Sequence, residues 1–200
     1  MIVASATVLF LVSVVNTTGV TYSHSQSLFA EFTGAAIFCW YLCLFADWTL
    51  HNLGHLRMKG NLMFQVHMEH HKVAYPVGKL LRPGPYIDGG GAMAFGPWIV
   101  ALWYAIFRFS PSTRVAGFIF GLSAVFLLVS DYLHIQYHVK DSWLETALGD
   151  WFLERRRYHF HHHNHLKDNM SLGGISTLVD RLCGSYWNEK ARAKPLAKYL

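Results

Sequence analysis

Histidines dominate the chemistry that this chain of 200 residues could perform, because ten of its thirteen histidines fall into four short groups. Two groups have the spacing HX3H and two have the spacing HX2HH. Residues three and four positions apart share one face of a helix, so we expect each group to direct its imidazoles to the same side. Imidazole is the commonest metal-binding side chain. The predicted metal ligands are His51, His55, His67, His70, His71, His134, His138, His159, His162 and His163.

Ten imidazoles are more than one metal ion can use, because zinc or iron takes about four to six ligands. Two ions would share them at about five each, which leaves a coordination position open for a reactant. Nitrogen ligands favour iron, copper or zinc, whereas magnesium and calcium prefer oxygen. The four groups therefore predict a reactive centre with two metal ions.

Two aspartates are placed to orient ligand histidines. Asp47 precedes His51 by four residues and Asp131 precedes His134 by three, so each carboxylate shares a helix face with its histidine. A ligand histidine usually donates its second ring N–H to such a partner. Glu69 lies on a different face of the second group, and we expect it to face solvent.

Three histidines stay outside the predicted ligand set. His24 lies far from the four groups, and His161 and His165 are part of the run from His159 to His165. The spacing of the fourth group selects His159, His162 and His163 from that run.

Composition identifies the class of protein that must position these groups. Hydrophobic residues make up 52% of the chain and charged residues only 14%, against about 25% charged residues in soluble domains. Abundant aromatic residues exclude a disordered chain, and three cysteines without a CxxC motif exclude a disulfide framework and a thiolate zinc module. The composition indicates a membrane protein.

Crossing a bilayer takes roughly 20 apolar residues per helix. The sequence predicts an all-α integral membrane protein, a single domain over 1–200 with about four transmembrane helices and a histidine-rich cap. The expected spans are residues 1–15, 28–50, 92–109 and 115–133, and the connector 110–114 is short enough for a hairpin between antiparallel helices.

Lysines and arginines set the expected orientation. Fifteen of the 17 lie in the segments 51–91 and 134–200, which carry the histidine groups. By the positive-inside rule these segments and both termini face the cytoplasm. Anionic lipid headgroups account for the net charge of +5, and no nucleic-acid partner is expected.

The order of the groups and the residues that follow them resemble one family. After the fourth group come Asn169, Gly173-Gly174-Ile175 and the stretch Asp180–Tyr186, which is similar to a closing pattern of Asn, Gly and Asp-x-Leu-Phe-Gly-Thr. Cys183 and Ser185 stand where that pattern often has Phe and Thr. Over roughly residues 30 to 190 the chain resembles the fatty acid hydroxylase / sterol desaturase superfamily of membrane di-iron oxygenases.

This resemblance implies two iron ions, which zinc can replace in purified protein, with Asn169 as a further residue that supports the ligands. It implies O2-dependent hydroxylation of a lipid, whether fatty-acyl, sphingoid or sterol-like. With no cytochrome b5 domain expected in the chain, electrons come from a separate carrier of the ferredoxin or cytochrome b5 type. The bacterial inner membrane and the endoplasmic reticulum are both consistent locations.

Other functions share some of these features. A lipid desaturase or a carotenoid ring hydroxylase would use the same histidine groups. A membrane metal-binding or transport protein is the alternative of another class. Transporters place their ligands near the bilayer midplane, whereas these histidines lie beyond the ends of the apolar stretches, which favours the enzyme.

Overall fold

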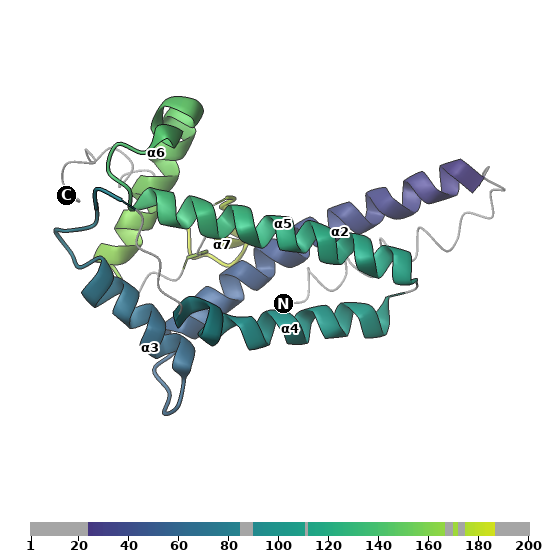
Figure 1. The fold of residues 1–200 in the computed structure, drawn as a ribbon, viewed down its shortest axis with the longest axis horizontal. Coiled ribbons are helices and arrows are strands. Elements are labelled where there is room, and N and C mark those ends of the chain that lie inside the picture. Colours follow the sequence, from purple (N-terminus) through teal and green to yellow (C-terminus); the bar gives the residue numbers. More distant parts are fainter. Residues whose placement is uncertain (1–23, 85–89, 111, 167–169, 172–174, 187–200) are drawn as a thin grey trace. The chain divides into compact units, whose positions relative to one another are not determined.

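The computed structural model describes residues 24–84, 90–110, 112–166, 170–171 and 175–186. By internal contacts the chain forms two compact units, Met1–Gly34 and Ala35–Leu200. The described part of the first unit is helical and begins α2. The helices are α2 (His24–His55), α3 (Leu62–Glu69), the π-helix η1 (His70–Ala74), α4 (Gly90–Phe109), α5 (Thr113–Tyr137), α6 (Trp143–Asn164) and α7 (Leu178–Leu182) (Figure 1). No strand occurs among the described residues, which confirms the all-α prediction for that part of the chain.

Among the described residues, two helices are long and apolar enough to cross a membrane, over Leu28–His55 and Thr113–Tyr137. They correspond to the second and fourth predicted spans. The third predicted span falls in α4, where the apolar helical stretch Phe95–Phe109 is shorter, and residues 1–15 lie outside the described residues. Large apolar side chains on these helices are exposed, such as Tyr104 and Leu128, as suits a surface that lipid covers.

The helices α2 and α5 continue past their apolar stretches. The expected spans end at residues 50 and 133, but α2 runs to His55 and α5 to Tyr137. The first histidine group therefore belongs to the last two turns of α2. His134 lies in the last turn of α5, and His138 is its C-cap residue. A rigid helix thus carries each of these two groups.

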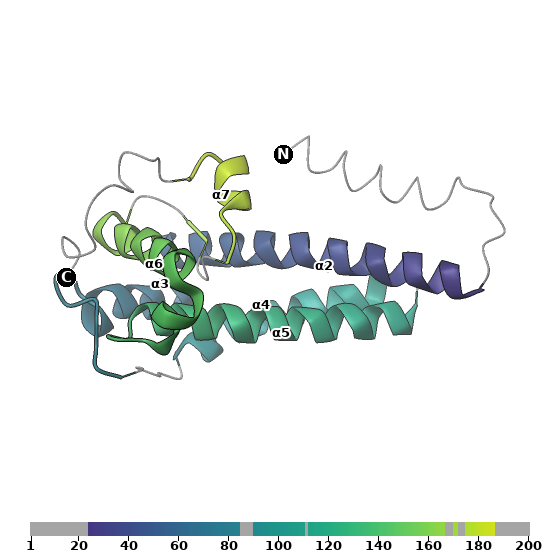
Figure 2. The same cartoon turned by 90° about the horizontal axis from the view of Figure 1, so that it is seen from above.

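The connector at residues 110–114 joins α4 and α5 as a hairpin, as predicted, and the two helices run side by side (Figure 2). Ser112 caps α5 by accepting a hydrogen bond from the backbone N–H of Val115 at 3.1 Å. The indole of Trp103 on α4 donates to the hydroxyl of Ser123 on α5 at 2.8 Å. The thiol of Cys39 on α2 contacts the carbonyl oxygen of Ile119 on α5 at 3.5 Å, in a shared apolar core.

A buried arginine fixes α6 to the end of α5. Arg156 is 1% exposed, and it donates to the backbone carbonyls of Gln136 and Val139 at 3.2 and 2.9 Å. Its other nitrogen forms an ion pair with Glu145 at 2.5 Å. These contacts satisfy carbonyl groups that the end of a helix leaves without partners. They also hold the fourth histidine group beside the third.

The segment between η1 and α4 runs against the same helix end. The backbone N–H of Arg82 donates to the carbonyl oxygen of His138 at 2.8 Å, and that of Lys140 donates to the carbonyl oxygen of Arg82 at 2.7 Å. This short bridge holds residues 80–82 beside the third histidine group. The third and fourth histidine groups and residues 80–82 therefore meet at the C-terminal end of α5.

Candidate metal centre

Nine of the ten predicted ligands form two clusters, and within each cluster the ring nitrogens lie within 4.8 Å of one another. The first cluster takes its histidines from α2, α3, η1 and α6, and the second from η1, the end of α5 and α6. The first cluster consists of His51, His55, His67, His71 and His162. The second consists of His70, His138, His159 and His163.

Distances within the first cluster fit a set of metal ligands. The Nε2 of His55 lies 2.9 Å from the Nε2 atoms of both His67 and His162. It lies 3.3 Å from that of His51. A neutral imidazole has a single N–H, so one ring cannot donate to three nitrogens. Nitrogens bound at about 2.1 Å to one ion and at right angles to each other would be about 3.0 Å apart, close to the distances found here.

Backbone carbonyls fix which ring nitrogen faces the clusters. The Nδ1 of His51 donates to the carbonyl oxygen of Met170. The Nδ1 of His138 donates to Leu80 at 2.8 Å, and that of His163 donates to Tyr75 at 3.2 Å. Once Nδ1 carries the proton, Nε2 presents a lone pair, which is the state that binds a metal ion.

In the second cluster the Nε2 of His159 lies 2.9 Å from that of His138 and 3.0 Å from that of His163. The Nε2 of His70 is buried and has no hydrogen-bond partner among the described residues. Buried polar atoms are nearly always partnered. A nitrogen without a partner, beside lone pairs that converge, is the environment that a bound cation would complete.

His134, the tenth predicted ligand, lies beside the second cluster. Its ring centroid is 4.7 Å from those of His70 and His159. Its Nε2 is buried and finds no hydrogen-bond partner in the described part of the chain. Its ring is thus in contact with the second cluster without being one of the four residues that form it.

Burial keeps these imidazoles neutral. It lowers the pKa of His67, His70, His71 and His163 well below the ordinary value, and neighbouring imidazoles lower it further. The pKa values of His138 and His159 are lowered in the same way. At neutral pH the rings are therefore in the form that coordinates a metal ion.

A family model described as fatty acid hydroxylase matches residues 36–185. The chain belongs to the fatty acid hydroxylase family. No curated protein and no solved structure matches it. The matched residues include all ten predicted ligands and the closing pattern, which confirms the family that the sequence suggests. Together, the family and the two clusters support a lipid oxygenase-type function and an association with membranes.

The spacing predicted that each HX2HH group directs all its imidazoles to one side. In this fatty acid hydroxylase family member the two HX2HH groups are instead divided between the clusters. His67 and His71 belong to the first cluster, whereas His70 belongs to the second. His162 likewise joins the first cluster, while its neighbour His163 joins the second. Adjacent residues on a helix point about 100° apart, so each double histidine serves both clusters.

The orienting partner of His51 differs from the prediction. The Nδ1 of His51 bonds to the carbonyl oxygen of Met170, so this nitrogen does not depend on Asp47. Asp47 is buried on α2, and its contribution to the centre stays a prediction. Asp131 is exposed, and its contribution to the orientation of His134 likewise stays a prediction. Asn169 lies outside the described residues.

The remaining sequence expectations fit the family member's geometry. His161 and His165 face each other, with ring centroids 4.4 Å apart, and belong to neither cluster. Glu69 is exposed. The side chain of His24 lies outside the described part of the structure.

Sequence reasoning missed the groups that hold the clusters in place. The carbonyls of Tyr75, Leu80 and Met170 leave no trace in a side-chain pattern. The ring of Tyr75 also stacks on His138, with centroids 3.7 Å apart and planes 15° apart. Asp180, which is fully buried, accepts hydrogen bonds from the backbone N–H and the hydroxyl of Ser171 at 2.9 and 2.8 Å. Its place in the closing pattern was the one available signal.

Proposed function

We propose that this protein is a membrane di-iron oxygenase that hydroxylates an unactivated C–H bond of a lipid with O2 and electrons from an external carrier. The substrate class is a fatty-acyl chain, a sphingoid base or a sterol-like ring. The observation that carries this proposal is the pair of adjacent clusters, built entirely of imidazoles, in a chain of the fatty acid hydroxylase family.

The two clusters would each hold one iron ion. The first offers five imidazoles, and the second offers four with His134 beside them. Iron bound there would supply the oxygen chemistry that cleavage of an unactivated C–H bond requires. The ring centroids of His71 and His163, from the first and second clusters, are only 4.1 Å apart, so both clusters would act on the same small volume.

The chain's own residues would hold this centre rigid and dry. Three backbone carbonyls fix the ring orientation of His51, His138 and His163. Burial excludes water from the imidazoles and keeps them uncharged. Such preorganisation places a substrate carbon at a fixed distance from the reacting centre, which is the main contribution that a protein makes to cofactor chemistry.

We place the chain in the membrane with four spans, with the histidine segments and both termini on the cytoplasmic side. The clusters lie at the ends of α2 and α5, which supports a centre at the membrane boundary that a lipid chain reaches laterally. The location would be a bacterial inner membrane or the endoplasmic reticulum.

Elemental analysis of the purified protein beside a His162→Ala, His163→Ala variant tests the centre. Near two iron ions per chain, depleted in the variant, is the expected result. One ion or none, unchanged in the variant, would contradict the proposal and favour a metal-binding or transport role.

The reaction is tested with 18O2 in cells that make the protein. A hydroxylase yields a lipid that is heavier by one labelled oxygen atom. A product lighter by two hydrogens and without label would identify a desaturase instead, and a labelled carotenoid would identify a ring hydroxylase. An unaltered lipid profile, compared with that of the double histidine variant, would count against all three.

A further inference from the structure

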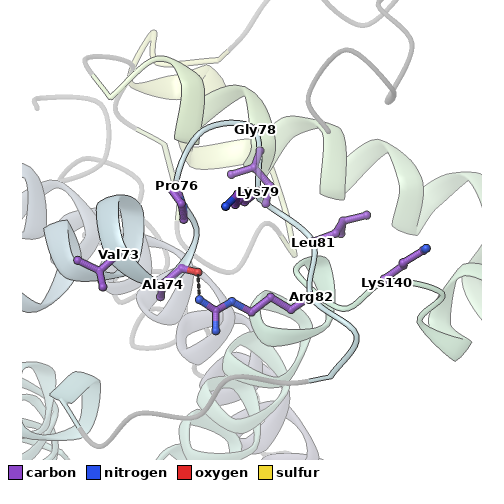
Figure 3. A pocket seen from close by; sticks show the side chains of 9 residues that line it. Val73, Ala74, Pro76, Gly78, Lys79, Leu81, Arg82 and Lys140 are labelled. Carbon is purple, nitrogen blue, oxygen red and sulfur yellow. Dashed lines mark hydrogen bonds between the residues drawn. The ribbon is translucent and has the colours of Figure 1, made fainter.

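A pocket of about 660 Å³ lies between the segment Val73–Arg82 and Lys140 (Figure 3). Three of its lining residues are the cations Lys79, Arg82 and Lys140, and none is acidic. Lys79 and Lys140 are exposed to solvent, as is Val73 on the rim at 67%. Exposed positive charge beside apolar side chains, with no acidic residue in the lining, complements the surface of an acidic protein.

The floor of this pocket is bonded to the second cluster. Leu80 lines the pocket, and its carbonyl oxygen accepts the Nδ1–H of His138 at 2.8 Å. Beside it, the guanidinium of Arg82 lies 5.3 Å from the ring centroid of Tyr75, and that ring stacks on His138 at 3.7 Å. A single layer of residues therefore separates the pocket from a predicted metal ligand, along two independent contacts.

The cations are not arranged to bind one small anion. The guanidinium of Arg82 donates to the carbonyl oxygen of Ala74, as the dashed line in Figure 3 shows. The side chains of Lys79 and Lys140 end far apart in that view, with Leu81 between them. Separate, exposed charges suit the distributed carboxylates of a protein surface better than a single phosphate.

We propose that an acidic electron-carrier protein docks on this pocket and that electrons enter the second cluster through His138. This inference rests on the proposed function and names the surface that its electron donor uses. Each reduced carrier would lose one electron and each ferric ion would gain one, so two dockings bring both ions to the ferrous state. The charge of the surface would steer the encounter as well as stabilise the complex.

The test reverses the charge of the pocket in the iron-loaded protein, reconstituted in nanodiscs of neutral phosphatidylcholine. The Lys79→Glu, Lys140→Glu variant is compared with an Arg57→Glu, Lys59→Glu control, which changes the same charge at exposed residues between α2 and α3. The probes are an acidic [2Fe–2S] ferredoxin and the soluble domain of cytochrome b5. Binding of the oxidised carriers and reduction by the reduced carriers are both measured, and dithionite serves as a reductant that needs no docking.

The pocket variant should bind the carrier that the wild type prefers at least tenfold more weakly at low salt, and carrier-driven reduction should slow by a similar factor. The rate at which dithionite reduces the pocket variant should stay within twofold of the wild-type rate. The Arg57→Glu, Lys59→Glu control should match the wild type in carrier binding and in reduction. Added salt should weaken wild-type binding, because it screens exposed charges.

Three results would overturn the docking proposal. The pocket variant and the control could lose carrier binding equally, the pocket variant could keep full carrier binding, or neither carrier could bind to the wild type. The proposal would also be overturned if the pocket variant bound phosphatidylserine vesicles more weakly than the wild type while its carrier binding was unchanged. That result would indicate a lipid-headgroup site instead. Failure of the proposed function is distinguishable, because it appears as missing iron or as no 18O product when protein reduced with dithionite and then freed of it is exposed to 18O2, while carrier binding can still be measured.

Discussion

The Nδ1 of His51 donates a hydrogen bond to the carbonyl oxygen of Met170, although the two residues are 119 positions apart in the sequence. The next residue, Ser171, is held by Asp180 through its backbone N–H and its hydroxyl. A buried carboxylate therefore fixes the segment that orients a predicted ligand of the first cluster.

The same carboxylate is tied back to α2. The indole of Trp48 donates to the hydroxyl of Ser185 at 3.1 Å, and that hydroxyl donates to Asp180 at 3.2 Å. This chain of hydrogen bonds therefore joins α2 at Trp48 and again at His51, one helical turn further on. The last described segment of the chain is thus locked onto the helix that carries the first histidine group.

Replacing Asp180 with Ala should destabilise the protein and loosen His51. The N–H and hydroxyl of Ser171 would lose their acceptor, and each buried donor left unpaired costs about 1–3 kcal/mol. We expect a lower thermal unfolding midpoint and less metal in the first cluster, measured by calorimetry and elemental analysis. Asp150→Ala is the control, because Asp150 is exposed. Equal metal content in the two variants would show that Asp180 does not position His51.

The neighbours His70 and His71 should affect different metal ions. His71→Ala removes a nitrogen from the first cluster and His70→Ala removes one from the second. Each variant should lose chiefly one of two ions, and Mössbauer spectra of 57Fe-loaded protein should lose a different component in each case. Loss of the same component from both variants would contradict the assignment of adjacent histidines to separate clusters.

A side chain at Gly54 should crowd the first cluster, because a Cβ there would lie 3.2 Å from the ring of His67, closer than an ordinary contact. Gly54→Ala would shift that ring by a few tenths of an ångström from its position in the first cluster. We expect metal affinity to fall by the order of 10–100-fold, as when groups that support metal ligands are changed. Gly117→Ala on α5 is the matched control, since nothing lies within 4 Å of its added methyl group. Competition with a chelator measures the metal affinity of both variants. A metal affinity of Gly54→Ala equal to that of the wild type would refute the prediction.

Acid should destabilise the metal-free protein. Burial lowers the pKa of His67, His70 and His159 in the folded chain, whereas the unfolded chain has ordinary values near 6.5. The unfolded state therefore binds more protons below that pH, and stability falls as pH falls. The unfolding midpoint should be nearly constant above about pH 7 and should drop progressively below about 6.5. A midpoint that rises on acidification would contradict buried neutral imidazoles.

The sequence made the centre largely predictable, because metal-binding side chains reveal themselves by type and spacing. The length of the apolar stretches likewise predicted the positions of α2 and α5. The division of the histidines between two clusters could also have been predicted from helix geometry, since neighbours such as His162 and His163 cannot point the same way on a helix. For Asp131, spacing gives a helix face shared with His134 but not how exposed the carboxylate is, and the structure shows it exposed.

Other parts of the site could not be predicted from side-chain patterns. The partners of His51 and His138 are backbone carbonyls, which every residue has, so only the folded chain shows which ones are used. Arg156 gave no signal either, because its role comes from the helix end that it meets. These groups determine how well the centre is held, whereas the histidines determine what it can bind.

The distance between His51 and Met170 along the chain also sets the order of biosynthesis. At about 5–20 residues per second, residue 170 leaves the ribosome roughly 6–24 s after residue 51. During that interval His51 lacks both the carbonyl that orients it and its cluster partner His162. The first cluster can therefore be complete only after residue 170 has been synthesised. An ion that requires all five imidazoles of the first cluster would therefore bind after that point, and not while α2 is the only part of the cluster that has been made.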